Sequence, residues 1–398
     1  MSATLKSQMI AKERKLKGLP VYNFGLGANP LHISKMYSNE MKKYLEMKNY
    51  VSASGVDKFQ KVIQKLYSNI NYKVKHILTG NGLKELLFIV QMAFEGTIIH
   101  ITPSWLSYKE QINILNKKNN LVEIETKLEN DYKIDLEELE RTLSKIPKET
   151  PKLMIFNNPN NPTGVVHTIN EVKQIAKILN KYNVLVMSDE IYTNLSYIPT
   201  VSISMYIPHL TIRGSSVSKD LGCGGYRLGW ITFPDELTDL FQKCNSLASS
   251  IYSCTNVPTQ YATASIISDK NMFGHICNNT KAIFSFVIRD ICECIHNSKC
   301  KDMIRYVYPK AAWYLFLNFD KYKDKLITNG INTSSELQEF LLNKYGIVTV
   351  SGDNFSVSGF NLRFSLVDIL DFEENDDGDI CKKMKEGIKL LLGYFENL

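Results

Sequence analysis

The sequence predicts an α/β protein with a large part built on a mainly parallel sheet between helices and a smaller α+β part. Three observations predict this class. Short runs rich in β-branched residues alternate with helical patterns from residue 73 to 234, which is typical of strand–helix units in a parallel sheet. A long helical region at 258–297 follows, and apolar strands return only after it. With 398 residues, the chain is long enough for two domains.

Strands and helices of the large part follow one another along the chain. Helices are predicted at 81–94 and 170–183, where apolar residues recur at helical spacing. The predicted strands cover residues 73–80, 96–105, 152–164 (ending in a loop rich in Asn and Pro), 183–192, 211–219 and 227–234.

The smaller part is predicted from the C-terminal third of the chain. Its strands are expected at 308–319, 346–352 and 360–367. We expect the N-terminal segment to pack on it, so that the large domain interrupts the small one. The predicted boundaries are a large domain at 48–280 and a small domain formed by 1–47 and 281–398.

Composition excludes several classes of function. The net charge of +6 is spread over 47 basic and 41 acidic residues without a basic block, so no nucleic-acid partner is expected. There is no apolar run of about 20 residues and no apolar core of a signal peptide, so we expect no membrane contact. Eight cysteines without paired spacing indicate reduced thiols and a cytoplasmic location.

The densest cysteine group is predicted to pack in the core and to bind no metal. It contains Cys292, Cys294, His296 and Cys300. Helical residues two apart do not share a face, so this spacing is poor for zinc.

Polar and aromatic residues gather at the predicted strand ends. Sheets of this kind bind ligands at the carboxyl ends of their strands, which favours one shared site over unrelated surface loops. The residues are Asn81, Trp105, Asn161, Asp189, Tyr192, Ser216 and Lys219.

The segment 216–230, SVSKDLGCGGYRLGW, holds Lys219 and Arg227 among several glycines. It is either a flexible surface loop with incidental charges or part of a built site. In a built site, a lysine amine can form a Schiff base with an aldehyde cofactor. Pyridoxal 5'-phosphate also requires an acid beside its ring nitrogen, donors to its ring oxygen, a stacking surface and a phosphate cradle. All of these residue types stand at the strand ends.

Asp189 is the candidate acid because it follows the apolar run Leu185–Met187. An ionised carboxylate in such surroundings would keep a ring nitrogen protonated, although a strand-end acid can also simply cap a loop. Glu190 should point to the opposite face of the sheet, because side chains alternate along a strand. Tyr192 and Asn161 are candidate donors to the ring oxygen.

The remaining candidates would hold the ring face and the phosphate. Trp105 either stacks on the ring or belongs to the core. The helix that begins near Asn81 offers backbone N–H groups to a phosphate. Ser216 adds a hydroxyl, and Arg227 adds a guanidinium that matches phosphate oxygens.

Three motifs carry a resemblance to a known family. They are S-x-S-K-x-x-G-x-x-x-x-R-x-G at Ser216–Gly229, N-P-x-N-P-T-G at Asn158–Gly164 and D-E-x-Y at Asp189–Tyr192. From about Tyr22 to Arg363, the chain resembles the fold-type I pyridoxal-phosphate enzymes of the class I/II aminotransferase family. The resemblance implies a seven-stranded sheet sandwiched by helices, with a smaller α+β domain.

The resemblance also implies a role for each cofactor residue. Lys219 would carry the cofactor as a Schiff base and move the proton of the substrate α-carbon. Asp189 would pair with the ring nitrogen, Tyr192 and Asn161 would bind the ring oxygen, and Trp105 would stack on the ring. The phosphate would be held by Asn81, Gly82, Leu83, Ser216 and Arg227.

Substrate and partner residues are implied in the same way. Arg363 would clamp the α-carboxylate, and Gly27 and Asn161 would lie beside it. Tyr50 would reach the phosphate of a neighbouring subunit, which implies a homodimer with active sites at the subunit interface. The Asn161–Pro162 bond is expected to be cis.

The function expected from these residues is transfer of an α-amino group between an amino acid and a 2-oxo acid in a ping-pong cycle. A pyridoxal-phosphate-dependent lyase, such as a C–S lyase or an enzyme like aminocyclopropane-carboxylate synthase, would use the same residues. A non-catalytic regulatory or binding protein on this scaffold is the alternative from another class. No second arginine for a side-chain carboxylate can be placed, and Tyr22, Phe24 and Tyr314 are candidates to line an apolar pocket.

Overall fold

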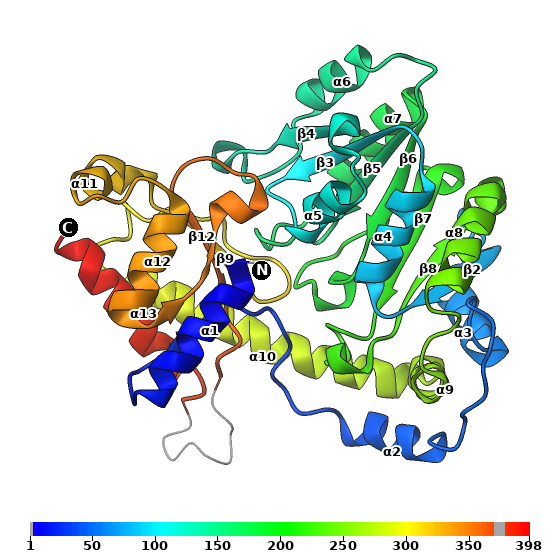
Figure 1. Cartoon of the computed structure of the whole chain (residues 1–398), viewed down its shortest axis with the longest axis horizontal. Coiled ribbons are helices and arrows are strands. Elements are labelled where there is room, and N and C mark those ends of the chain that lie inside the picture. The colour runs from blue at the N-terminus through cyan, green and yellow to red at the C-terminus, as the bar shows by residue number, and fades with distance from the viewer. Residues whose placement is uncertain (1–2, 370–378) are drawn as a thin grey trace.

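A computed structural model describes residues 3–369 and 379–398 of the chain. Its centre is a seven-stranded sheet in the order β2-β8-β7-β6-β5-β3-β4 (Figure 1). The strands are β2 (His76–Gly80), β3 (Thr97–Thr102), β4 (Leu121–Glu125), β5 (Lys152–Asn157), β6 (Val184–Asp189), β7 (Thr211–Ser216) and β8 (Gly229–Phe233).

Of these seven strands, β8 alone is antiparallel to the direction that the other six share. It pairs antiparallel with both β2 and β7, whereas the β3–β4, β3–β5, β5–β6 and β6–β7 pairs are parallel. The start of β8 therefore lies at the same edge of the sheet as the carboxyl ends of the other strands. This places the residues before β8 beside those that follow β2 and β7.

Helices cover both faces of the sheet because the strands are apolar on both faces. Leu153 and Ile155 of β5 pack into the cluster that includes residues of α4 (Leu83–Ala93), α5 (Ser107–Ile114) and α8 (Thr238–Ile251). Met154 and Phe156 face the opposite cluster, which includes residues of α6 (Leu136–Lys145) and α7 (Ile169–Lys181). This alternation is the period of a strand buried on both sides.

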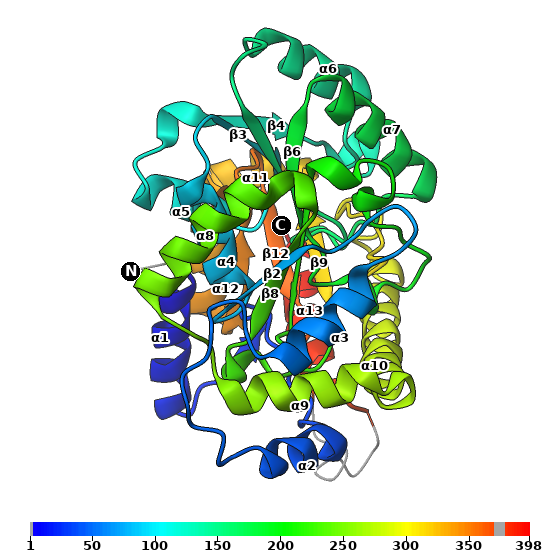
Figure 2. The same cartoon turned by 90° about the vertical axis from the view of Figure 1, so that its right-hand side faces the viewer.

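The end of the sheet at β2 and β8 is covered by a further apolar cluster. It joins Ile77 and Trp230 to α3 (Asp57–Tyr67) and α9 (Val257–Ser268). Figure 2 shows α2 (Lys35–Lys43) below α9, against which it packs.

A second lobe has its own sheet and core (Figure 1). Its antiparallel sheet has the order β11-β12-β9, with β11 at Val350–Ser351, β12 at Asn361–Ser365 and β9 at Tyr314–Asn318. A short parallel pair joins β1 (Tyr22–Asn23) to β10 (Ile347–Val348). Its helices are α1 (Ala3–Leu16), α11 (Lys323–Thr328), α12 (Ser334–Tyr345) and α13 (Lys382–Glu396).

The helix α10 (Lys270–His296) links the two lobes, because it packs against α9 and against α13. The predicted helical region 258–297 is therefore two helices. The break falls at Asp269, whose carboxylate accepts the backbone N–H groups of Asn271 and Met272 and so caps α10.

The structure confirms the predicted fold class. The predicted strands all appear, shortened at their ends, and the strand expected at 346–352 is divided into β10 and β11. The elements α5, β4 and α6 were not predicted. In the described part of the chain, no helix is both long and apolar enough to cross a membrane.

Candidate active site

A cavity of about 610 Å³ lies where the strand ends of the large sheet meet the second lobe. This volume is in the range of small-molecule sites, ~300–1,000 Å³. Its walls include the residues Gly27, Gly82, Leu83, Lys84, Trp105, Tyr108, Asn161, Asp189, Tyr192, Ser216, Lys219, Arg227, Tyr314 and Arg363. The structure thus brings together every predicted site residue except Asn81 and Tyr50.

Lys219 stands in the loop after β7, with its amine inside the cavity. Lys219 Nζ donates to Gly27 O at 2.5 Å and lies over the rings of Tyr192 and Trp313, 5.8 and 5.6 Å from their centroids. The loop turns through Gly222, which has φ +68°. The carbonyl of residue 27 thus holds the amine in the cavity.

Arg227 lies at the start of β8, beside the start of α4. Its Nη1 and Nη2 donate to Gly224 O at 2.7 Å and Asn81 O at 2.5 Å. A side chain at residue 82 would collide with Arg227, because a Cβ there would lie 2.6 Å from Arg227 Nη2. Arg227, Ser216 and the first residues of α4 all line the cavity, and a guanidinium, a hydroxyl and a helix N-terminus are groups that suit an anion.

Two of the three amides expected to hold a phosphate are already used within the chain. Asn81 N–H donates to Glu85 Oε2 at 2.7 Å, and Gly82 N–H donates to Gly80 O at 2.7 Å. Asn81 takes part in this part of the site through its carbonyl contact with Arg227. The sequence motif alone does not reveal the Glu85 contact.

Asp189 ends β6 and is 3 % exposed. Burial raises the pKa of Asp189 from 3.8 to about 6, while hydrogen bonds from Tyr108 and from the Ile191 N–H oppose this rise. Tyr108 Oη donates to Asp189 Oδ2 at 2.6 Å, and the Ile191 N–H donates to Oδ1 at 3.2 Å. Such a carboxylate favours a cationic partner in the cavity.

Sequence reasoning did not find Tyr108, because its part in the site depends on α5 packing beneath the end of β6. Trp105, at the start of the same segment, lines the cavity and meets the Tyr108 ring edge-on at 5.5 Å. Lys84 was also missed; its Nζ lies 4.8 Å from the Trp105 ring centroid.

A continuous polar chain joins Tyr192 to Arg363. Tyr192 Oη lies 2.8 Å from Tyr314 Oη, and Asn161 Nδ2 donates to Tyr192 Oη at 3.5 Å. Burial raises the pKa of Tyr192 well above that of a free tyrosine. Burial also acts to raise the pKa of Tyr314, but Lys219 and Arg363 outweigh it and the net direction is downward. Tyr192 therefore donates this hydrogen bond and Tyr314 accepts it.

Arg363 lines the same cavity as Arg227 and is 5 % exposed. Its Nη1 donates to Asn161 Oδ1 at 3.1 Å and its Nη2 donates to Gly25 O at 2.7 Å. These hydrogen-bond partners are neutral oxygens, and Arg363 forms no ion pair with a carboxylate of the described residues. A buried cation without a countercharge is costly, so this position fits an anionic ligand group.

Gly27 is required by the packing of the same region. A Cβ at residue 27 would lie 2.4 Å from Tyr314 Oη. Only the backbone of residue 27 fits between Tyr314 and Lys219.

Three predicted residues lie elsewhere. Tyr50 is 89 % exposed and does not line the cavity. Tyr22 and Phe24 were expected to line an apolar pocket, but they are buried in the core of the second lobe. Both side chains lie against Gly387 of α13. Because they face this helix, they cannot also face the cavity. The expected cis bond at Asn161–Pro162 is present.

Comparisons with known proteins agree with this arrangement. The sequence profile described as aminotransferase class I and II matches residues 22–374. A probable aspartate/prephenate aminotransferase of Aquifex aeolicus is 27 % identical over 379 residues, which cover 92 % of this chain and 91 % of that protein. An asparagine–oxo-acid transaminase of Streptococcus mutans is 27 % identical over 381 residues, with 92 % and 91 % covered.

Solved structures show the same fold. The aspartate aminotransferase of Thermus thermophilus with maleate superposes with a TM-score of 0.82 at 19 % sequence identity. The superposition covers 99 % of this chain and 96 % of that one.

Proposed function

The chain belongs to the class I and II aminotransferase family, and from that premise we propose that it binds pyridoxal 5'-phosphate in the cavity at the strand ends. The protein is an aminotransferase, and the proposal concerns how its own residues serve that reaction. The observation that carries it is that one cavity is lined by Lys219, by a buried acid, Asp189, and by two arginines.

The residues present fit this cofactor. Asp189 meets the requirement for a buried acid, Tyr192 and Asn161 offer polar hydrogens near it, and Trp105 offers a flat apolar face. The start of α4 with Ser216 and Arg227 offers an anion site that a Cβ at residue 82 would fill. Pyridoxal phosphate, when bound, supplies an aldehyde carbon for the lysine amine and a ring that withdraws electrons from the substrate α-carbon.

Each residue then has a stated task. Asp189 holds a proton on the ring nitrogen by its negative charge. Lys219 Nζ would take the proton from the substrate α-carbon as a general base and would release it, as a general acid, at the carbon on the other side of the substrate nitrogen. Arg363 binds the α-carboxylate of the amino acid or 2-oxo acid through its guanidinium fork.

The substrates are an α-amino acid and a 2-oxo acid. The names of the relatives place aspartate, asparagine and prephenate first among the compounds to test. The lyase alternative has no support among the relatives reported above, each of which is named as an aminotransferase or transaminase.

A homodimer with active sites at the subunit interface is part of this proposal. Tyr50 supports it, because its side chain is almost fully exposed and is free to enter the cavity of a second copy. The division into a large domain at 48–280 and a small domain at 1–47 and 281–398 is also proposed. The β1–β10 pair and the α1–α12 contact support it, because they join the N-terminal segment to the second lobe. The helix α2, by contrast, packs against α9, which covers the end of the large sheet.

A cytoplasmic location is proposed from the thiols. All eight cysteines of the sequence lie in the described residues, and each is free. This is the state expected in a reducing compartment.

Two experiments test the proposal. Borohydride treatment of the protein with pyridoxal phosphate, followed by peptide mass spectrometry, should locate the pyridoxyl group on Lys219, and Lys219→Ala should abolish the label. Labelling that persists in the Lys219→Ala protein would refute the assignment.

The second experiment is a panel of amino acids with and without a 2-oxo acid acceptor. Transamination requires the acceptor for repeated turnover, so product should stop at about one equivalent without it. Sustained release of ammonia or thiol without an acceptor would indicate a lyase.

A further inference from the structure

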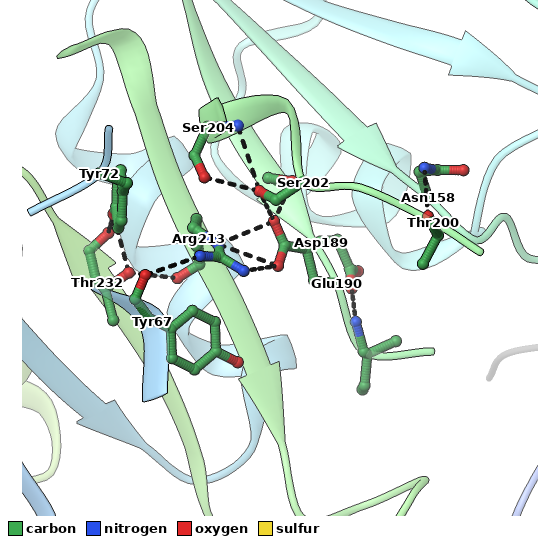
Figure 3. A network of polar contacts seen from close by, with 12 residues as sticks. Tyr67, Tyr72, Asn158, Asp189, Glu190, Thr200, Ser202, Ser204, Arg213 and Thr232 are labelled. Carbon is green, nitrogen blue, oxygen red and sulfur yellow. Dashed lines mark hydrogen bonds and ion pairs between the residues drawn. The ribbon is translucent and has the colours of Figure 1, made fainter. Parts of the chain in front are cut away.

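A second acid directly follows the acid that faces the cavity. Asp189 and Glu190 are neighbours in sequence, and both are buried, at 3 % and 5 % exposure. The alternation of side chains at a strand end sends them to opposite faces, so Asp189 lines the cavity while Glu190 points toward Arg213 (Figure 3). The predicted direction of Glu190 is therefore confirmed.

Arg213 of β7 pairs with Glu190 on that far face. Arg213 Nη2 and Nε donate to Glu190 Oε2 at 2.8 and 3.1 Å, and Nε also lies 3.2 Å from Oε1. The side chains of Glu190 and Arg213 are 4 % and 14 % exposed. The pair is thus a buried, nearly bidentate ion pair.

Neutral groups complete the surroundings of both charges. Ser188 and Ser202 hydroxyls donate to Glu190 Oε1 at 2.9 and 2.5 Å. Arg213 Nη1 donates to Tyr67 O at 3.2 Å, and the guanidinium lies over the rings of Tyr67 and Tyr72, at 4.4 and 5.5 Å. Figure 3 shows Ser202 and Arg213 beside Glu190, with Tyr67 next to Arg213. Without Arg213, Glu190 would keep two hydroxyl donors but lose its countercharge.

The charge of Glu190 matters for Asp189. Two neighbouring buried carboxylates oppose each other's ionisation. Burial raises the pKa of Asp189, Glu190 raises it further, and Tyr108, the Ile191 N–H and Lys219 lower it. Arg213 is the positive charge that offsets Glu190, since it lies within 3 Å of that carboxylate and on the side away from the cavity.

We propose that Arg213 is a positioning residue whose charge neutralises Glu190, keeps Asp189 ionised, and so sets the preference of the cavity for a cationic over a neutral ring. The inference rests on the proposed function, because the ring in question is that of pyridoxal phosphate. Arg213 touches neither the cavity nor its ligand; it acts through Glu190 and Asp189.

The test compares two probes in the cofactor-free protein. One is pyridoxal 5'-phosphate, and the other is its 1-deaza analogue, in which carbon replaces the ring nitrogen and no positive charge can form there. The ratio of their dissociation constants at pH 8 measures what the Asp189 charge contributes. A general loosening of the fold weakens the binding of both probes and leaves the ratio of their dissociation constants unchanged.

Arg213→Gln should lower the preference for pyridoxal phosphate roughly tenfold, the effect of about one pKa unit at Asp189. Arg213→Gln combined with Glu190→Gln should restore the ratio to within about threefold of the wild type, because both charges are then absent. Arg213→Lys should also retain it. An unchanged ratio in Arg213→Gln, or a double variant that falls as far as the single one, would overturn the proposal.

Glu190→Gln provides an independent test if Arg213→Gln does not fold. It leaves Arg213 unpaired near Asp189, so the preference for pyridoxal phosphate should rise; a fall or no change would overturn the proposal. If the wild-type protein binds pyridoxal phosphate but Arg213→Gln keeps the wild-type ratio, only this inference fails. If the wild type binds neither probe, the proposed function fails as well.

Discussion

Asp189→Asn should stabilise the cofactor-free protein while abolishing its preference for a cationic ring. The reason is the burial of the carboxylate, which raises the pKa of Asp189 from 3.8 to about 6. The folded pKa lies above the unfolded one. The contribution of Asp189 to stability is therefore complete below pH 3.8 and is lost as the pH rises through 6.

The size of this loss follows from the shift. About two pKa units at about 1.4 kcal/mol each give ~3 kcal/mol at pH 8, and about half of that is already lost at pH 5. Asparagine keeps the shape of the side chain and has no charge to bury. The free energy of unfolding of Asp189→Asn relative to the wild type should thus increase by ~1–2 kcal/mol between pH 5 and pH 8.

Urea unfolding of the cofactor-free proteins at pH 5, 6 and 8 measures this difference. Comparing pH 8 with pH 5 removes any constant difference between asparagine and a protonated aspartate. The reasoning is refuted if the difference between the two proteins does not change with pH, or if it changes in the opposite direction.

Asp220→Asn is a matched control. Asp220 is also buried, burial raises its pKa to about 6, and Asn194 Nδ2 donates to its Oδ2 at 2.7 Å. It does not line the cavity. The control should show the same pH-dependent gain in stability and keep the affinity for pyridoxal phosphate.

Other predictions concern the anion sites and the scaffold. Arg363→Lys should lower kcat/KM roughly 10–100-fold by losing bidentate contact with the carboxylate, without changing the absorbance of bound cofactor; an unchanged kcat/KM would contradict the role of Arg363. Gly229→Ala should weaken pyridoxal phosphate binding roughly tenfold or more, because its Cβ would lie 2.4 Å from Leu83 N. Gly225→Ala, whose Cβ would meet no atom within 4 Å, is the control, and equal affinities in a binding titration would count against the reasoning. Thr168→Ala should cost ~1 kcal/mol of unfolding free energy by removing the capping box with Glu171 at the start of α7, measured by urea unfolding, with cofactor affinity unchanged.

The fold class could be predicted because most strands and helices have a clear hydrophobic pattern in the sequence. The elements that were not predicted have a weak hydrophobic pattern. The strand β4 (LVEIE) carries two glutamates, and of its residues only Ile124 is buried, so the run does not read as a core strand. It lies at the edge of the sheet, where one neighbour is enough. The strands β5 and β6 are buried along their whole length, and each contains four consecutive apolar residues, Leu153–Phe156 and Val184–Met187.

Site residues could be predicted where their place at the end of a strand was enough to put them at the cavity. Asp189, Asn161 and Lys219 lie at the cavity because the topology brings these ends together. The roles of Tyr108 and Arg213 could not be predicted, because each depends on a contact between two segments of the chain. Tyr108 reaches Asp189 through the packing of α5 against the end of β6. Arg213 reaches Glu190 through the register between β6 and β7. Such contacts between segments are not encoded in any one segment.

The reversed direction of β8 has a consequence for how the chain tolerates change. Lys219 and Arg227 lie in the connection between two strands that are paired through Ser216 and Gly229. The pairing of β7 with β8 therefore fixes both ends of this connection, and with them the positions of the Lys219 amine and the Arg227 guanidinium relative to each other. A Cβ at Gly225 would meet no atom within 4 Å, so the side chain at this position can change while the two charges keep their places.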